Sequence, residues 1–215
     1  MTQKQQAPME IAIRKVKAGQ EDAFVAARAN FIRLLKAQDG VEKDWEFKSF
    51  FTMPEPDDSD VFVGMTRYNS METVGRLSEK LMGSPEAAAF FGTFDMKAFV
   101  LVTPADGQSF KLEDVIQHEG QVLEVAVRTP KAGMEGQFQA LRDGFFGKAA
   151  EQPGYIMDRE FIDAQSGANV VLIAWESQEA FTNALGVLQT QPEMGAFFSA
   201  IDAQAYQAMT LTTNE

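Results

Sequence analysis

The chain has 215 residues, one histidine, no cysteine and a formal net charge of −12. This charge disfavours nucleic acid and anionic membranes, because both attract basic surfaces. The lack of cysteine excludes disulfides, thiolate zinc sites and cysteine nucleophiles. Because no apolar run reaches the roughly 18 residues of a membrane span and no signal-like segment opens the chain, we expect a cytoplasmic protein.

The first half predicts alternating strands and helices. The strands are predicted by period-two alternation and β-branched residues, and the helices by apolar residues at helical spacing. We predict strands at 11–16, 41–51, 60–68 and 96–103, and helices between Gly19 and Gly40, at 70–82 and at 85–91. Ser70 is the expected N-cap of the second helix, and Ser177 of its counterpart.

The second half repeats this pattern. The phrase EIAIRKVKAG begins at Glu10, and EVAVRTPKAG begins 114 residues later at Glu124. Matches continue at this offset, and then at an offset of 107 after a seven-residue insertion in the first half. The acidic, proline-containing segment TMPEPDDSD is its predicted place, as a solvated hairpin loop without the spacing of a calcium-binding loop.

We therefore predict a tandem duplication with the class α+β. The expected domains are a ferredoxin-like repeat at 1–104, a linker at 105–120 and a second repeat at 121–215. Each β-α-β-β-α-β unit would leave one sheet face bare. Two such sheets facing each other would close a barrel, so that the chain forms an internal pseudo-dimer. A further homodimer stays open.

Charged residues alternate with apolar ones on the first strand of each repeat. We expect the isoleucines to face the helices, which would turn Glu10 and Arg14, and likewise Glu124 and Arg128, toward the barrel interior. One interpretation is a polar cavity in which the arginines orient an anionic or enolic ligand. The other is a set of salt bridges that joins the two sheets.

Tyr68 and Trp175 occupy matching positions at the ends of the third strands. Each could form an aromatic wall for a flat ligand or belong to plain packing. The phenylalanine pairs at 90–91 and 197–198 are predicted to be core, because aromatic residues at helical spacing normally pack inside.

The phrase WESQEAF, from Trp175 to Phe181, resembles the antibiotic-biosynthesis-monooxygenase-like domains of the dimeric α+β barrel superfamily. The VKAG and PKAG turns are similar to that family's strand-to-helix turn. The resemblance implies the fold but not one activity, since the superfamily includes cofactor-free monooxygenases, haem enzymes and lactone isomerases. Many members carry a histidine where this chain has Leu77 and Ala184.

The sole histidine, His118, falls in the predicted linker. We therefore expect no haem, flavin or metal. Two functions remain open. One is a cofactor-independent monooxygenase or isomerase that acts on a small aromatic or enolisable compound inside the barrel. The other is a non-catalytic ligand-binding or purely structural barrel. The candidate ligand-binding residues are Glu10, Arg14, Tyr68, Glu124, Arg128 and Trp175.

Overall fold

The computed structural model describes residues 7–53 and 60–214. Its strands are β1 (Met9–Val16), β2 (Val41–Met53), β3 (Val61–Tyr68), β4 (Phe94–Pro104), β5 (Val122–Pro130), β6 (Tyr155–Asp163), β7 (Asn169–Trp175) and β8 (Ile201–Asn214). Its helices are α1 (Glu21–Lys36), α2 (Met71–Leu81), α3 (Pro85–Phe91), α4 (Glu135–Ala150), α5 (Gln178–Leu188) and α6 (Pro192–Ser199), with a 3-10 turn η1 (Leu112–Asp114). The two halves share one order of elements, which confirms the tandem α+β prediction.

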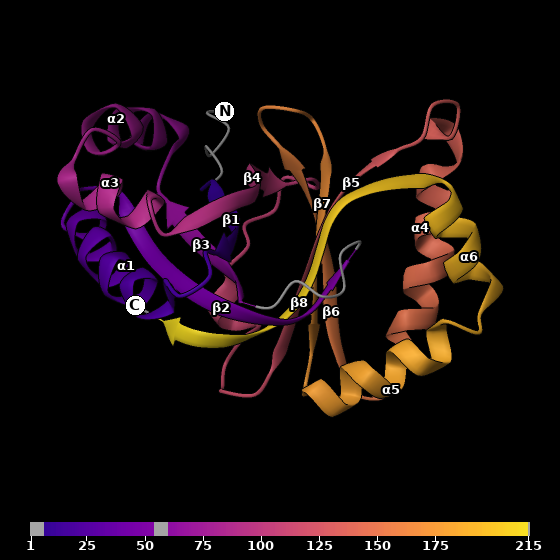
Figure 1. Cartoon of the computed structure of the whole chain (residues 1–215). Coiled ribbons are helices and arrows are strands. Elements are labelled where there is room, and N and C mark those ends of the chain that lie inside the picture. Colours follow the sequence, from indigo (N-terminus) through magenta and orange to yellow (C-terminus); the bar gives the residue numbers. More distant parts are fainter. Residues whose placement is uncertain (1–6, 54–59, 215) are drawn as a thin grey trace.

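The eight strands close into one barrel in the order β1-β3-β2-β8-β5-β7-β6-β4. Each half contributes four neighbouring antiparallel strands, and its helices cover the outside of those strands. The two helix layers therefore lie on opposite sides of the barrel (Figure 1). Ser70 and Ser177 each accept a hydrogen bond from a backbone N–H in the first turn of α2 and α5, as the sequence predicted.

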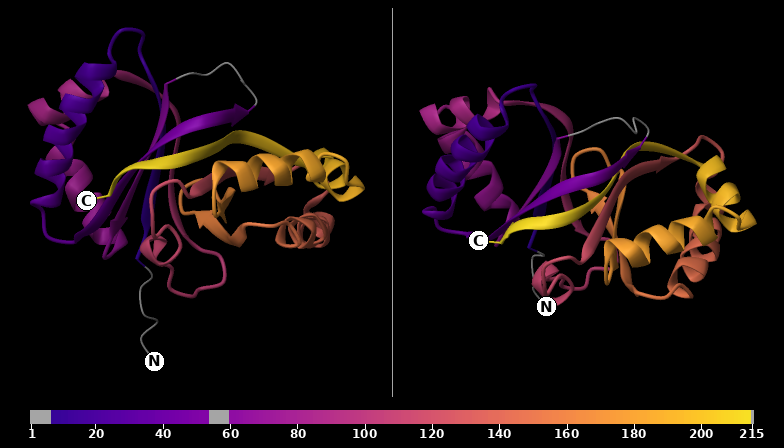
Figure 2. Two further views of the ribbon diagram at one scale, coloured as in Figure 1. Left: turned by 90° about the horizontal axis from the view of Figure 1, so that it is seen from below. Right: turned by 60° about the horizontal axis from the view of Figure 1, so that its bottom comes forward.

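The two seams that join the half-sheets differ in length. β2 pairs with β8 from Trp45 to Met53, whereas β4 pairs with β6 over only three positions. The long ribbon of β2 and β8 is visible in both views of Figure 2. Part of the predicted insertion is thus strand, because β2 continues through Met53; residues 54–59, with most of its acids, lie outside the described part.

The barrel interior is filled by apolar side chains from both halves. Ile11 and Ile13 belong to this core, together with Trp45 and Phe161. The prediction that the isoleucines face the helices is therefore wrong. An interior enclosed on all sides offers no water to a polar group, so it takes the more apolar face of each strand. The helix-covered face accepts the charged residues because they pair there.

The segment between the repeats is more than a spacer. Leu112 of η1 and Ile116 are buried in the barrel core. Glu113 accepts two hydrogen bonds from Arg67 of β3, at 2.7 and 2.9 Å. These contacts attach the segment to the first half-sheet. His118 is exposed nearby, and its Nδ1 lies 3.1 Å from the Glu119 carbonyl oxygen.

No helix in the described part of the chain is both long and apolar enough to cross a membrane.

Candidate ligand-binding sites between the helices and the sheet

All six predicted site residues lie between a half-sheet and its own helices, not between the two sheets. Separate cavities bring together Glu10, Arg14 and Tyr68 in the first repeat, and Glu124, Arg128 and Trp175 in the second. The predicted site inside the barrel is therefore wrong. The residues share one strand face, as predicted, but the helices cover that face.

In each repeat the strand-end aromatic hydrogen-bonds to the glutamate. The Tyr68 hydroxyl donates to Glu10 at 3.1 Å, and the Trp175 indole N–H donates to Glu124. Both contacts follow from register, since each aromatic lies two positions beyond the residue paired with the glutamate. Such diagonal neighbours are within reach of long side chains. The second repeat adds a donor, the Tyr206 hydroxyl, to the other oxygen of Glu124.

The arginines do not pair with these glutamates. Arg14 of β1 reaches across β3 and bonds both carboxylate oxygens of Glu46 on β2, at 2.7 and 2.8 Å. Arg28 of α1 binds the same glutamate and also Asp44. These four residues form the first tetrad, whose side chains are 2–7% exposed. It joins a helix to its sheet, so the predicted salt bridge between the two sheets is wrong.

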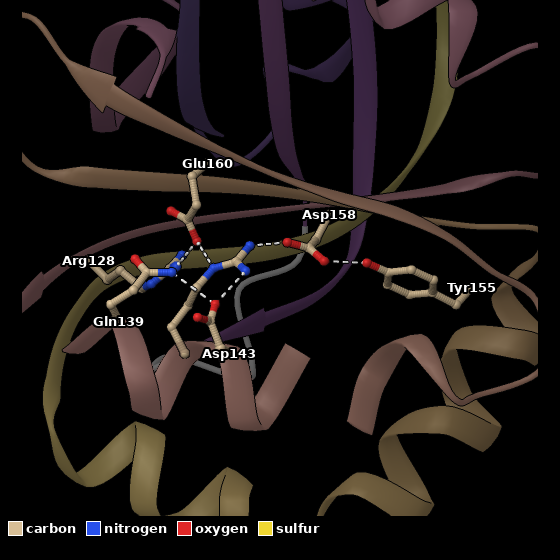
Figure 3. Close-up of polar contacts among 7 residues, drawn as sticks. Arg128, Gln139, Asp143, Tyr155, Asp158 and Glu160 are labelled. Carbon is tan, nitrogen blue, oxygen red and sulfur yellow. Dashed lines mark hydrogen bonds and ion pairs between the residues drawn. The ribbon is translucent and has the colours of Figure 1, made fainter. Parts of the chain in front are cut away.

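The second repeat contains the equivalent tetrad. Arg128 of β5 binds Glu160 of β6, and Arg142 of α4 binds both Glu160 and Asp158. Figure 3 shows this chain of contacts continuing from Asp158 to the Tyr155 hydroxyl. Arg142, Asp158 and Glu160 are 14–19% exposed, so this second tetrad is less buried than the first.

Aromatic rings hold the strand arginine in both repeats. The Arg14 guanidinium carbon lies 5.5 and 5.3 Å from the Phe24 and Phe90 ring centroids. The equivalent distances for Arg128 are 5.6 Å to Phe138 and 5.3 Å to Phe197. Cation–π contacts of this kind stabilise a desolvated cation. The predicted phenylalanine core is thus also the aromatic surround of the arginine.

A cavity of about 110 Å³ lies in the second helix layer. Glu124 and Arg128 are its charged lining residues, and the remaining wall is almost entirely apolar or aromatic. Phe51 and Met53, from the extended end of β2, close one side, so the first repeat contributes to the cavity of the second. The main aromatic lining residues are Phe145, Phe146, Trp175, Phe181, Phe197 and Tyr206.

The polar groups of this cavity have unused capacity. Arg128 is 1% exposed, yet its Nε and Nη1 have no hydrogen-bond partner. Oε2 of Glu160, which pairs with Arg128 but does not line the cavity, also has none. Burial lowers the pKa of Arg128, although the nearby Glu160 carboxylate acts to raise it. Burial raises the pKa of Glu124 to about 7, despite the hydrogen bonds from Tyr206 and Trp175. The Arg128 guanidinium, which has unused hydrogen-bond donors, and the Glu124 carboxyl, whose pKa is about 7, therefore line one apolar cavity.

The equivalent space in the first repeat is divided in two. A cavity of about 40 Å³ surrounds the first tetrad, and a groove of about 370 Å³ lies between α2 and β4. Glu10 lines both, while Arg14 lines only the small one. Burial raises the pKa of Glu10, and Tyr68 and Arg14 act to lower it. Burial also raises the pKa of Asp44, to about 6.

Sequence reasoning missed the partners that complete these sites. The repeat could have pointed to the tetrads, because their charged residues recur at an offset of 114. Recurrence alone does not show which of these residues contact one another. Tyr206 had no such signal, since Phe99 stands at its matching position. The missed residues are Arg28, Asp44, Glu46, Arg142, Asp158, Glu160 and Tyr206.

These cavities do not fit an imidazole-ligated haem. The chain's only histidine, His118, is exposed and lines none of the cavities described above. Among residues 7–53 and 60–214, no three His, Asp or Glu side chains gather as a metal-binding group.

Comparison with known proteins gives the fold a context. No protein-family model matches the chain, and neither does any curated protein sequence. Among solved structures, an anthrone oxidase-like protein matches with a TM-score of 0.68 and 10% identity, over 100% of this chain and 95% of its own. The chlorite dismutase-like protein TA0507 matches with a TM-score of 0.65 and 9% identity, over 97% and 96%.

A monooxygenase-like protein from Fusobacterium nucleatum subsp. nucleatum matches with a TM-score of 0.58 and 7% identity, covering 98% of this chain and 94% of its own. Identities this low establish the fold alone. The matches extend along almost the whole of each chain, and so include both repeats. This chain has a dimeric α+β barrel fold, built from two tandem ferredoxin-like repeats.

Proposed function

We propose that the chain binds a small planar molecule in the second-repeat cavity and exchanges a proton with it through Glu124. The observation that carries this proposal is that Glu124 and a buried arginine, whose Nε and Nη1 have no hydrogen-bond partner, line the same apolar cavity. The volume of about 110 Å³ is smaller than that of an engineered apolar cavity of about 150 Å³ that binds benzene, so it limits the ligand to at most a single ring. Arg128 would stabilise the enolate or phenolate that forms, and Trp175 would contact its face.

The isomerisation needs no group beyond the substrate and this cavity, and the oxygenation needs only dioxygen in addition. A base that titrates near pH 7 can remove a proton and return it. Return to a different carbon completes an isomerisation. Alternatively, the carbanion of a CH2 group forms a C–O bond with dioxygen and, after protonation, gives a hydroperoxide. Loss of the second C–H proton then breaks the O–O bond, which leaves a carbonyl group and releases water, and this is a monooxygenation. The names of the fold neighbours, which include monooxygenase-like and oxidase-like proteins, agree with the second course.

Binding can be tested with 4-nitrophenol, a single-ring compound whose ionised form absorbs visible light. We expect the parent protein to bind the phenolate. Arg128→Met should weaken this binding by roughly 10-fold to 100-fold, the value of a charge-assisted hydrogen bond. The matched control is Arg14→Met, which changes the equivalent arginine of the other repeat and should leave binding unchanged. Equal losses in both variants would reject the second cavity as the site.

A non-catalytic binder is the second candidate, because both oxygens of Glu124 already accept a hydrogen bond from the protein. Deuterium exchange at the α-carbon of cyclohexanone, followed by NMR, separates the two. A proton-transfer site predicts faster exchange with the parent than with Glu124→Gln. Equal rates, together with intact nitrophenol binding, would leave a ligand-binding protein without catalysis.

A further inference from the structure

The first repeat has its own groove, which is distinct from the cavity used above. It runs between α2 and β4 and measures about 370 Å³, within the range of small-molecule sites. Leu35, Leu77 and Leu81 form buried parts of its wall. It is more than three times as large as the second-repeat cavity, so it can admit a longer molecule.

The rim of this groove exposes large apolar side chains. Met82, Met96 and Phe99 are 54%, 41% and 43% exposed, and all three line the groove. Methionine side chains adapt to ligands of irregular shape because they are unbranched and polarisable. Apolar surface gathered around a concavity is typical of a binding site rather than of scattered surface residues.

The charged group of the groove is Glu10. Its carboxylate accepts a hydrogen bond from Tyr68, and no ion pair of Glu10 is found in the described part of the chain. Arg14, four residues along the same strand, directs its guanidinium to Glu46 and lies in the separate small cavity. The groove therefore presents a carboxylate but no cation to an entering molecule.

We propose that this groove binds a hydrophobic amine, with its ammonium group paired to Glu10 and its hydrocarbon part lying between α2 and β4. Glu10 is partly buried, and a partly desolvated carboxylate is stabilised further by a cation in direct contact. Burial raises the pKa of Glu10 although Tyr68 and Arg14 act to lower it, so a ligand cation in direct contact would add stabilisation that these two groups leave incomplete. The rings of Phe31, Tyr68 and Phe91 offer π-faces to the same cation. The net charge of −12 also favours the approach of cations.

Three probes that differ only in their polar end can test this site: 3-phenylpropylamine, 3-phenylpropan-1-ol and 3-phenylpropionate. We expect calorimetric titration to show that the amine binds best and the carboxylate worst. Glu10→Gln should reduce the affinity for the amine by about 10-fold to 100-fold, because a charge-assisted contact is lost. Its affinity for the alcohol should stay unchanged.

Two further variants make the test specific. Glu124→Gln alters the equivalent glutamate of the second repeat and should leave amine binding intact. Ser78→Trp places a large side chain at the exposed rim of the groove, where folding is little affected, and should block all probes. The proposal is overturned if no probe binds, if the carboxylate binds best, or if amine binding survives either Glu10→Gln or Ser78→Trp. None of these readings depends on catalysis or on the second cavity.

Discussion

The two helix layers share their charged residues and differ in the residues that fill space around them. Gly64 of β3 lies between Ala12 and Glu46 in the register, so Arg14 must cross it to reach Glu46. A Cβ at Gly64 would overlap the Arg14 guanidinium. The second repeat has Val171 at the matching position, and there Arg128 makes one hydrogen bond to Glu160, whereas Arg14 makes two to Glu46.

Two more substitutions separate the layers. Leu35 of α1 fills space that Ala149 leaves open in α4, and Phe99 stands where the second repeat has Tyr206. The first layer therefore has a closed tetrad and an outer groove, while the second has one cavity that reaches its arginine. After a duplication, two sites can therefore come to differ in cavity size and shape through changes in the size of neighbouring side chains, while the paired charged residues stay the same.

The largest expected difference between the layers is in the cost of breaking a tetrad. Arg28→Met leaves the buried Asp44 carboxylate without a cation, while Glu46 keeps Arg14, and should lower the free energy of unfolding by about 3–5 kcal/mol. Arg142→Met should cost less, about 1–3 kcal/mol, because water reaches its partners. Urea denaturation of both variants measures the difference. Equal losses would mean that the two tetrads are equally buried in solution.

A pH-dependent difference follows from Glu124. Its pKa is about 7 in the folded protein and about 4.3 in an unfolded chain. Between these values the folded state binds more protons, so the stability present below pH 4 is lost as pH rises through 7. Glu124→Gln cannot ionise, so its free energy of unfolding should exceed that of the parent by about 4 kcal/mol at pH 8 and match it at pH 4. Thermal melts of both proteins across this range test the sign; a gap that narrows with rising pH would contradict it.

The close approach at Gly64 gives a smaller effect. Gly64→Ala should lower the free energy of unfolding by about 1–3 kcal/mol, because the added methyl group displaces Arg14. The matched control is Gly75→Ala on α2, where an added Cβ meets no other atom. That change should be neutral or stabilise by up to about 1 kcal/mol, as helical alanine does. If both variants behave alike in chemical denaturation, Arg14 does not depend on the glycine.

The smallest predicted effect concerns a feature that the repeats share. Ser70→Ala and Ser177→Ala each remove one N-cap hydrogen bond, and each should cost about 1 kcal/mol. Ser70 also donates a hydrogen bond to the Thr73 hydroxyl at 3.1 Å, whereas Ala180 stands at the matching position in the second repeat, so the loss at Ser70 should equal or slightly exceed the loss at Ser177 in paired thermal melts. A clearly larger loss at Ser177 would contradict this.

The sequence by itself determined the duplication, the order of elements and the closure into a barrel. Strand alternation, helix caps and two offsets of repetition are local or pairwise patterns, and each survives without knowledge of packing. The six candidate residues also come together in their repeats, because register follows from the strands that the pattern predicts. The bond from Tyr68 to Glu10 is an example of such a contact.

Only the tertiary structure decided which face of each strand turns inward. Alternation separates Ile11 and Ile13 from Glu10 and Arg14 but is symmetric between the two faces, so it cannot assign either one. Both the barrel interior and the layer between helices and sheet can bury apolar side chains. The isoleucines lie in the barrel interior, which is enclosed on all sides. The tetrad partners, the β2 wall of the second cavity and the division of the first cavity likewise depend on volumes and distances between elements, which no single strand or helix encodes.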